Sequence, residues 1–122
     1  MNEEGKNVDL KTRTRAFALR IIRLYVSLSS SQVSQVIGRQ MLRSGTSVGA
    51  HYREAQRSRS TKEFVSKLDG GRQELEETMY WLELLRDSGG RSKALDALYA
   101  ETDEWMAILT TCVRNAKRRD ES

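Results

Sequence analysis

Proline is absent from the 122 residues of the chain, and aromatic side chains account for only 7% of them. Proline interrupts helices because it lacks a backbone N–H, while aromatic residues are enriched in strands. A sequence of this kind permits long uninterrupted helices and offers little material for sheets. The composition therefore favours an all-α fold, and the length is that of one domain, 1–122, with a single core.

Cysteine and histidine occur once each, as Cys112 and His51. Zinc sites and the carboxylate-bridged di-metal sites of helical bundles need several such ligands, so the counts exclude both. His51 has no paired Ser, Cys or carboxylate cluster to orient it for catalysis, and Cys112 continues an apolar stripe. We therefore expect no catalytic residue, no metal, no cofactor, no small-molecule substrate and no enzymatic activity.

Long apolar runs are also missing, since none approaches the ~18 residues that a membrane span requires. The first five residues, Met-Asn-Glu-Glu-Gly, are polar and acidic and so differ from a secretory signal. We expect a cytoplasmic protein that does not enter a membrane.

The charges are unevenly distributed, although the formal net charge is only +4. From Leu10 to Arg53 there are eight basic residues and no acidic one, whereas from Gln73 to Glu104 nine acidic residues face three basic ones. This asymmetry has two interpretations: a basic face for an anionic partner such as RNA, or attraction between helices within or between subunits. The sequence excludes neither.

Apolar residues recur at helical spacing in four segments, which predicts helices at about 10–28, 32–57, 61–87 and 93–118. Short polar turns separate the segments, and each segment follows a residue suited to cap a helix. Four such helices predict an antiparallel, up-down-up-down, left-handed four-helix bundle. The expected caps are Asp9, one of the serines at 27–31, Ser60 with Glu63 three residues later, and Ser92.

Three glycines share one surface of the second predicted helix: Gly38, Gly45 and Gly49. Each costs about 1 kcal/mol relative to alanine in a helix. Another backbone therefore approaches closely there, or the helix kinks or breaks between Ser44 and Gly49. We predict that Gly45, Gly49 and the neighbouring Tyr52 serve in helix packing or in an oligomer interface.

The third predicted helix has a weak point at 69–71, Asp-Gly-Gly, which costs about 2 kcal/mol by propensity and marks a kink or another close approach. Towards its end, Tyr80-Trp81-Leu82 and Leu84-Leu85 place large apolar groups all around the helix. One bundle core cannot cover all of these groups. We therefore predict that Tyr80 and Trp81 are core or interface anchors, and that the chain forms a homo-oligomer.

Arginines form a stripe along the second predicted helix, because the spacings of four, ten and four place them on one side. Guanidinium groups in such a row donate paired hydrogen bonds to phosphates and release counterions. Two cations extend the stripe into the following turn, and three arginines of the first helix can lie beside it. The predicted nucleic-acid-binding residues are Arg39, Arg43, Arg53, Arg57, Arg59, Lys62, Arg13, Arg20 and Arg23.

The alternative is that these arginines are a solvated face or pair with acidic residues of neighbouring helices or subunits. The stacking platform of aromatic side chains that typical RNA-binding modules carry is missing. Two functional hypotheses follow. The leading one is a non-enzymatic homo-oligomer that binds RNA or another polyanion, and the other is a protein-interaction scaffold without affinity for nucleic acid.

Four strings of the sequence, in order, resemble a known family of helical bundles. They are Phe-Ala-Leu-Arg-Ile-Ile at 17–22, Arg-Ser-Gly-Thr-Ser-Val-Gly-Ala-His-Tyr-Arg-Glu-Ala-Gln at 43–56, Phe-Val-Ser-Lys-Leu at 64–68 and Glu-Thr-Met-Tyr-Trp-Leu-Glu-Leu-Leu at 77–85. With them the chain, from about Leu10 to Arg118, resembles the proteins linked to intervening sequences in 23S ribosomal RNA genes.

The resemblance implies an antiparallel four-helix bundle that commonly associates as a ring-shaped homopentamer. It also implies an association with RNA, inferred from gene context and from the similar accessory bundles of diversity-generating retroelements. One departure is the Asp-Gly-Gly-Arg string at 69–72, where the family continues with apolar residues. This departure puts the straightness of the third helix in question.

Overall fold

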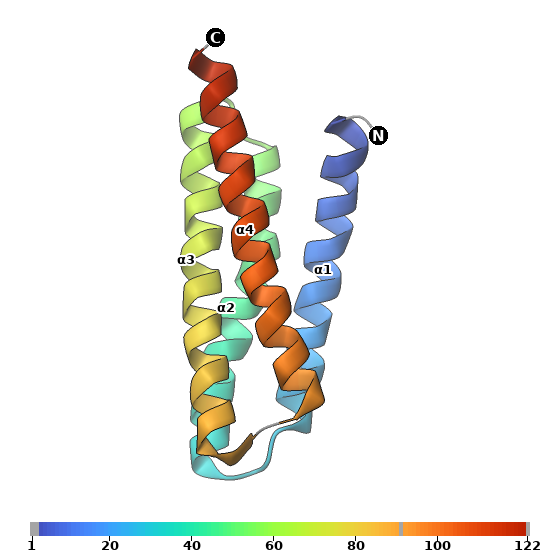
Figure 1. Ribbon diagram of the computed structural model, residues 1–122, viewed down its shortest axis with the longest axis vertical. Helices are drawn as coiled ribbons and strands as arrows, with labels where there is room; N and C mark the ends of the chain where they lie inside the picture. Colours follow the sequence, from blue (N-terminus) through green and yellow to red (C-terminus); the bar gives the residue numbers. More distant parts are fainter. Residues whose placement is uncertain (1–2, 91, 122) are drawn as a thin grey trace.

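The computed structural model describes residues 3–90 and 92–121 and contains four long helices arranged as a bundle (Figure 1). No strand occurs among these residues, so the predicted all-α class is confirmed. The elements are α1 (Glu3–Ser27), α2 (Gln32–Gln56), α3 (Thr61–Leu85), a wider π-helical turn η1 (Arg86–Gly90) and α4 (Lys93–Glu121).

The chain runs down α1, up α2, down α3 and up α4, so that sequential helices are antiparallel (Figure 1). Helix α2 packs extensively against both α3 and α1, and α4 packs against α3. The fourth pair of neighbouring helices, α1 and α4, packs less closely than the other three. The up-down-up-down topology is as predicted, and the left-handed twist stays a prediction.

The predicted start of the first helix is wrong. Helix α1 begins at Glu3, so Asp9 lies within the helix and does not cap it. The segment before Asp9 contains no proline, and its acidic residues suit the positive end of a helix dipole, so nothing in it stops the helix. At the other end of the chain, α4 continues to Glu121, past the predicted 118.

Serine side chains cap the other three helices, as predicted. Within η1, Gly89 adopts a φ of 105°, a conformation that suits glycine, and this residue lets the chain leave α3 for α4. In the caps, Oγ of Ser31 accepts from the N–H of Ser34 at 3.2 Å, Oγ of Ser60 from Glu63 at 3.1 Å, and Oγ of Ser92 from Leu95 at 3.1 Å.

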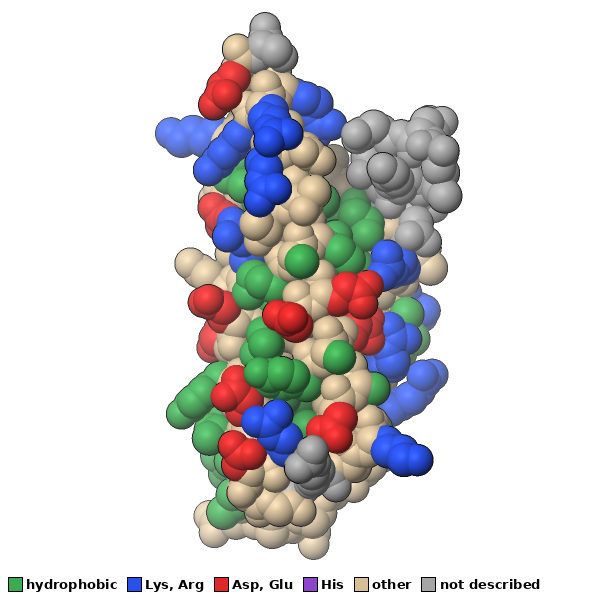
Figure 2. Space-filling model, viewed as in Figure 1, with side chains coloured by type: hydrophobic (Ala, Val, Ile, Leu, Met, Phe, Trp, Pro, Cys, Tyr) green, Lys and Arg blue, Asp and Glu red, His purple; other side chains and the backbone are tan. Residues whose placement is uncertain are grey.

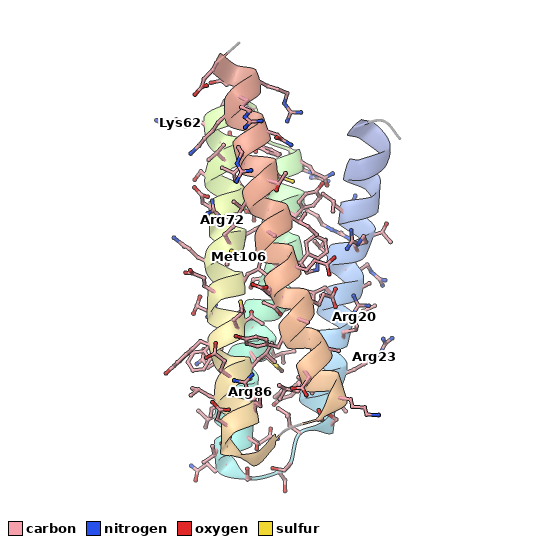
Figure 3. The ribbon with its side chains drawn as sticks, viewed as in Figure 1. Arg20, Arg23, Lys62, Arg72, Arg86 and Met106 are labelled. Atoms are coloured by element: carbon pink, nitrogen blue, oxygen red, sulfur yellow. The ribbon has the colours of Figure 1, made fainter. Side chains whose placement is uncertain are left out.

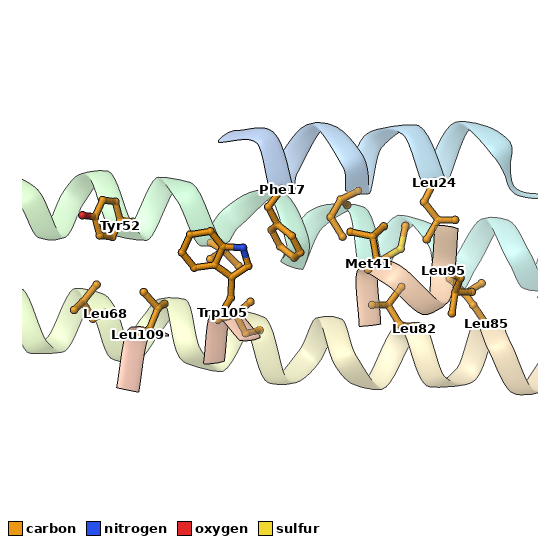
Figure 4. Packing of buried hydrophobic residues seen from close by; sticks show 14 of the residues in the cluster. Phe17, Leu24, Met41, Tyr52, Leu68, Leu82, Leu85, Leu95, Trp105 and Leu109 are labelled. Carbon is orange, nitrogen blue, oxygen red and sulfur yellow. The ribbon is translucent and has the colours of Figure 1, made fainter. Parts of the chain in front are cut away.

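One hydrophobic core runs along the bundle and receives side chains from all four helices (Figure 4). The two largest fully buried side chains are Trp105 and Phe17, whose ring centroids are 6.5 Å apart at a tilt of 57°. Tyr52 is also part of this core, with only 2% of its surface exposed. The apolar stripes that predicted the helices therefore face a single interior.

The glycines of α2 lie where α1 crosses it. Helix α2 is continuous from Gln32 to Gln56, so the alternative of a break between Ser44 and Gly49 is wrong. A Cβ atom at Gly45 would lie 2.8 Å from Cγ1 of the fully buried Ile21. At Gly49 the nearest atom is Oγ1 of Thr14, 3.4 Å away. The packing therefore requires glycine at position 45 but leaves room for a methyl group at position 49.

The paired glycines of α3 mark a close approach of α2 and do not interrupt the helix. A Cβ atom at Gly70 would lie 2.7 Å from the imidazole ring of His51, and one at Gly71 would lie 3.2 Å from Leu109. Helix α3 is continuous through the Asp-Gly-Gly-Arg string. His51 therefore fills the space that Gly70 leaves between α2 and α3.

We predict opposite effects for two Gly→Ala substitutions on the same helix. Gly49→Ala should raise the melting temperature, because it gains up to about 1 kcal/mol of helix propensity at no steric cost. Gly45→Ala should lower stability by about 1–3 kcal/mol, since the methyl group overlaps Ile21 and overpacks the core. Thermal unfolding followed by circular dichroism measures both. Equal signs for the two variants would contradict the assigned α1–α2 contact.

Candidate nucleic-acid interface

The arginine stripe of α2 lies on the side of the helix that faces away from the core. Arg39, Arg43, Arg53 and Arg57 are all exposed, whereas Met41, Val48 and Tyr52 on the opposite side are buried. Thr14 of α1 lies against Gly49, so Lys11 and Arg15, both exposed, lie on the neighbouring outer side of α1. The residue-based prediction missed these two cations, because it had no register between α1 and α2.

Two of the predicted arginines of α1 instead bind α4. Arg20 donates two hydrogen bonds to the Glu101 carboxylate, from Nε at 2.8 Å and from Nη2 at 2.6 Å, and this contact raises its pKa. The same carboxylate accepts from Nε1 of Trp105 at 3.2 Å. Arg13 lies 3.2 Å from Glu104 and stacks over the Trp105 ring. These arginines therefore join α1 to the acidic helix α4.

Arg43 forms a comparable link between α2 and α3. Its guanidinium group lies 3.1 Å from the Glu77 carboxylate and 3.5 Å from that of Glu74. Six predicted residues form no ion pair with the residues that the structure describes, and all six are exposed. They are Arg23, Arg39, Arg53, Arg57, Arg59 and Lys62; Figure 3 shows Arg20 between α1 and α4, whereas Arg23 and Lys62 extend outward.

The antiparallel topology gathers a larger group of cations at one end of the bundle. The end of α2, the start of α3 and the end of α4 meet there (Figure 1). Residues 53–63 and 114–121 together contain eight basic and four acidic side chains. Figure 2 shows basic side chains clustered near this end of α4. We call this region the basic end; its α4 members are Arg114, Lys117, Arg118 and Arg119.

Sequence reasoning assigned the cations of α4 to the helix dipole only, because nothing local shows that α4 ends beside the end of α2. The signal lies in the topology: in an up-down-up-down bundle, the second and fourth helices finish at the same end. When this rule is applied to the predicted helices, it places the cations at the ends of the second and fourth helices side by side, which is the basic end.

Exposed apolar side chains lie at the opposite end, on the first half of α2 and the second half of α3. Val33, Val36 and Tyr80 are 58%, 48% and 54% exposed, and the ring of Tyr80 packs against the half-buried Trp81 with centroids 5.1 Å apart. We call these four residues the apolar patch. Hydrophobic side chains gather near this end of the molecule in Figure 2. Tyr52, by contrast, lies in the core, where burial raises its pKa to about 12.

Polar side chains are also buried between α2 and α3. The hydroxyls of Ser44 and Thr78 share a hydrogen bond of 2.7 Å. The pKa of Glu74 is raised, mainly because burial disfavours its charged form and further because of Glu77, while Arg43 and His51 oppose the shift. In the described part of the chain, no cluster of side chains is suited to a metal ion, and no helix has the length and hydropathy of a membrane span.

The fold and this surface define a class: a four-helix bundle with a basic end, an arginine stripe and an apolar patch. More specifically, the chain belongs to the 23S rRNA-intervening sequence protein family, whose model matches residues 6–111. It is also similar to a solved structure from Bacteroides thetaiotaomicron VPI-5482, described as a protein with unknown function from the S23 ribosomal protein family. That match has 34% identity and a TM-score of 0.82, and covers 89% of this chain and 98% of the other.

No curated protein matches the chain. Neither the family nor the solved structure is described as an enzyme.

We predict that Glu74→Gln raises the melting temperature at pH 7 and has less effect near pH 4. Because the pKa of Glu74 is higher in the folded protein than in the unfolded chain, the unfolded chain loses the Glu74 proton at a lower pH. The stabilising contribution of protonated Glu74 is therefore present below its ordinary pKa of 4.5 and is lost as the pH rises through the raised value. Melting curves at both pH values test this, and a larger gain at pH 4 would contradict it.

Proposed function

We propose that the protein is a non-enzymatic, homo-oligomeric helical bundle that binds RNA or another polyanion through the arginine stripe and the basic end. The observation that carries this proposal is the exposure of Arg39, Arg53 and Arg57 on one face of α2, where they form no ion pair with any described residue. Charges that form ion pairs within the molecule are already neutralised, whereas a row of exposed cations attracts an anionic partner.

The dimensions of the stripe suit a phosphate backbone. A helix rises about 1.5 Å per residue, so the stripe spans about 27 Å between Arg39 and Arg57. That length covers several phosphates of one strand, and the basic end continues the positive surface beyond Arg57. The family description, which refers to 23S rRNA, supports an RNA partner over other polyanions.

We predict that the triple variant Arg39→Ala, Arg53→Ala, Arg57→Ala binds a labelled structured RNA much more weakly than the wild type. Each lost phosphate contact should also reduce the salt dependence, so the slope of log K against log salt should fall by about two to three. Fluorescence anisotropy at about 50 and 200 mM salt measures both effects.

The matched control removes three charges elsewhere: Lys67→Gln, Arg72→Gln and Lys93→Gln. Lys67 and Arg72 pair with Glu54 and Asp69, and Lys93 lies at the far end of the bundle. This control should retain more RNA affinity and a steeper salt slope than the triple variant. If the wild type binds no RNA at low salt, the polyanion proposal is wrong, and a protein-interaction scaffold becomes the function to pursue.

The apolar patch supports self-association of the chain. Val33, Val36 and Tyr80 leave about half or more of their surfaces in contact with water. Exposed apolar groups on two helices that pack against each other favour an interface, and Tyr and Trp are common anchors there. We therefore propose that copies of this chain meet through the patch, as a homopentamer by resemblance to the family. A cytoplasmic location also stays a prediction.

We predict that Val36→Glu combined with Tyr80→Glu yields a monomer of 14.0 kDa, whereas the wild type has a multiple of this mass. Two buried carboxylates cannot be paired in an apolar interface, so association becomes unfavourable. Light scattering after size exclusion measures the mass. Val26→Glu is the control, since Val26 is 75% exposed on α1 outside the patch. A monomeric wild type would overturn this part of the proposal.

A further inference from the structure

A cavity of about 520 Å³ opens at the basic end, between the end of α2, the start of α3 and the last turns of α4. Its volume lies in the range of small-molecule sites. Tyr52, Phe64 and Ala116 contribute apolar surface to its lining. Arg59 and Arg119 contribute positive charge, and Asp120 contributes one carboxylate.

The lining combines three kinds of contact that one nucleotide needs. The half-buried Phe64 lines the cavity, and an aromatic ring is the kind of side chain on which a base stacks. The guanidinium group of Arg59, which pairs with no described carboxylate, can bind a phosphate. Asp120 is an acceptor for a ribose hydroxyl or a base amine. Inorganic phosphate could use only the second of these contacts.

The surroundings favour the same ligand. The cavity lies within the basic end, where eight cations exceed four carboxylates, so the local potential favours an anion despite Asp120. The arginine stripe of α2 leads to this cavity, since Arg57 is adjacent in sequence to Ser58 and Arg59, which line it.

We propose that this cavity holds a single nucleotide unit, with the base against Phe64 and the phosphate on Arg59. The inference rests on the proposed function, because it specifies how the polyanion surface distinguishes nucleic acid from other polyanions. The unit is a free nucleotide or one nucleotide of an RNA strand, which share the same chemistry.

The test uses 5′-AMP and inorganic phosphate as probes at equal ionic strength. Amide chemical shifts of the labelled full-length protein, followed during titration with each probe, give both affinity and location. Shifts with AMP should centre on residues 56–64 and 116–120, and phosphate alone should bind roughly tenfold or more weakly. Arg59→Gln should weaken AMP binding by a similar factor. Lys93→Gln, which removes one charge at the other end of the bundle, should leave it unchanged.

Three results would overturn the inference: phosphate binding as tightly as AMP, shifts centred elsewhere, or an Arg59→Gln variant with wild-type affinity for AMP. RNA anisotropy in parallel separates this inference from the proposed function. RNA binding without AMP binding contradicts the proposed cavity site but agrees with the proposed polyanion surface. AMP that binds in the cavity and displaces RNA supports a unit of the strand, whereas AMP binding without RNA binding supports a free nucleotide and contradicts the proposed function.

Discussion

The rest of the structure depends on the close packing of α2 between α1 and α3. On one side the backbone of α2 at Gly45 lies against Ile21, and on the other the Ser44 hydroxyl reaches Thr78 across a narrow gap. Small residues on both flanks bring the three helices together, and the side of α2 that remains faces solvent. That side carries the arginine stripe, so the packing that builds the core also presents the cations.

Electrostatics serves two purposes in this molecule. Arg20 and Glu101 join α1 to α4, the neighbouring helices that otherwise pack least closely, and the Trp105 indole hydrogen-bonds the same carboxylate. An exposed ion pair contributes at most about 1 kcal/mol, so such links orient α1 more than they hold it. The cations of the basic end are different, because they exceed the acidic residues around them. The structure thus shows attraction between helices on one face, while the excess of cations at the basic end supports the proposed anionic partner.

The fold was largely predictable from the sequence because its signals are local. Heptad-like apolar spacing and the serine caps, such as Ser60 with Glu63, each lie within one or two turns of helix. The predicted cap at Asp9 failed since a capping residue without a preceding stop signal does not end the helix. The candidate site was predictable only in part. The partners of Arg20 and Arg43, the place of Arg15 and the basic end all depend on register between helices, which the spacing along one helix does not contain.

The apolar patch and the basic end lie towards opposite ends of the bundle, although the arginine stripe that leads to the basic end begins at Arg39, three residues after Val36. The apolar patch occupies the first half of α2 and the second half of α3, whereas the basic end combines the last turns of α2 and α4. Copies that associate through the patch therefore leave their basic ends free. Because phosphate contacts on linked subunits act at high effective concentration, an assembly of modest individual sites gains affinity for a long strand. The proposed assembly would therefore bind a long RNA strand more tightly than a single bundle with a few unpaired arginines would.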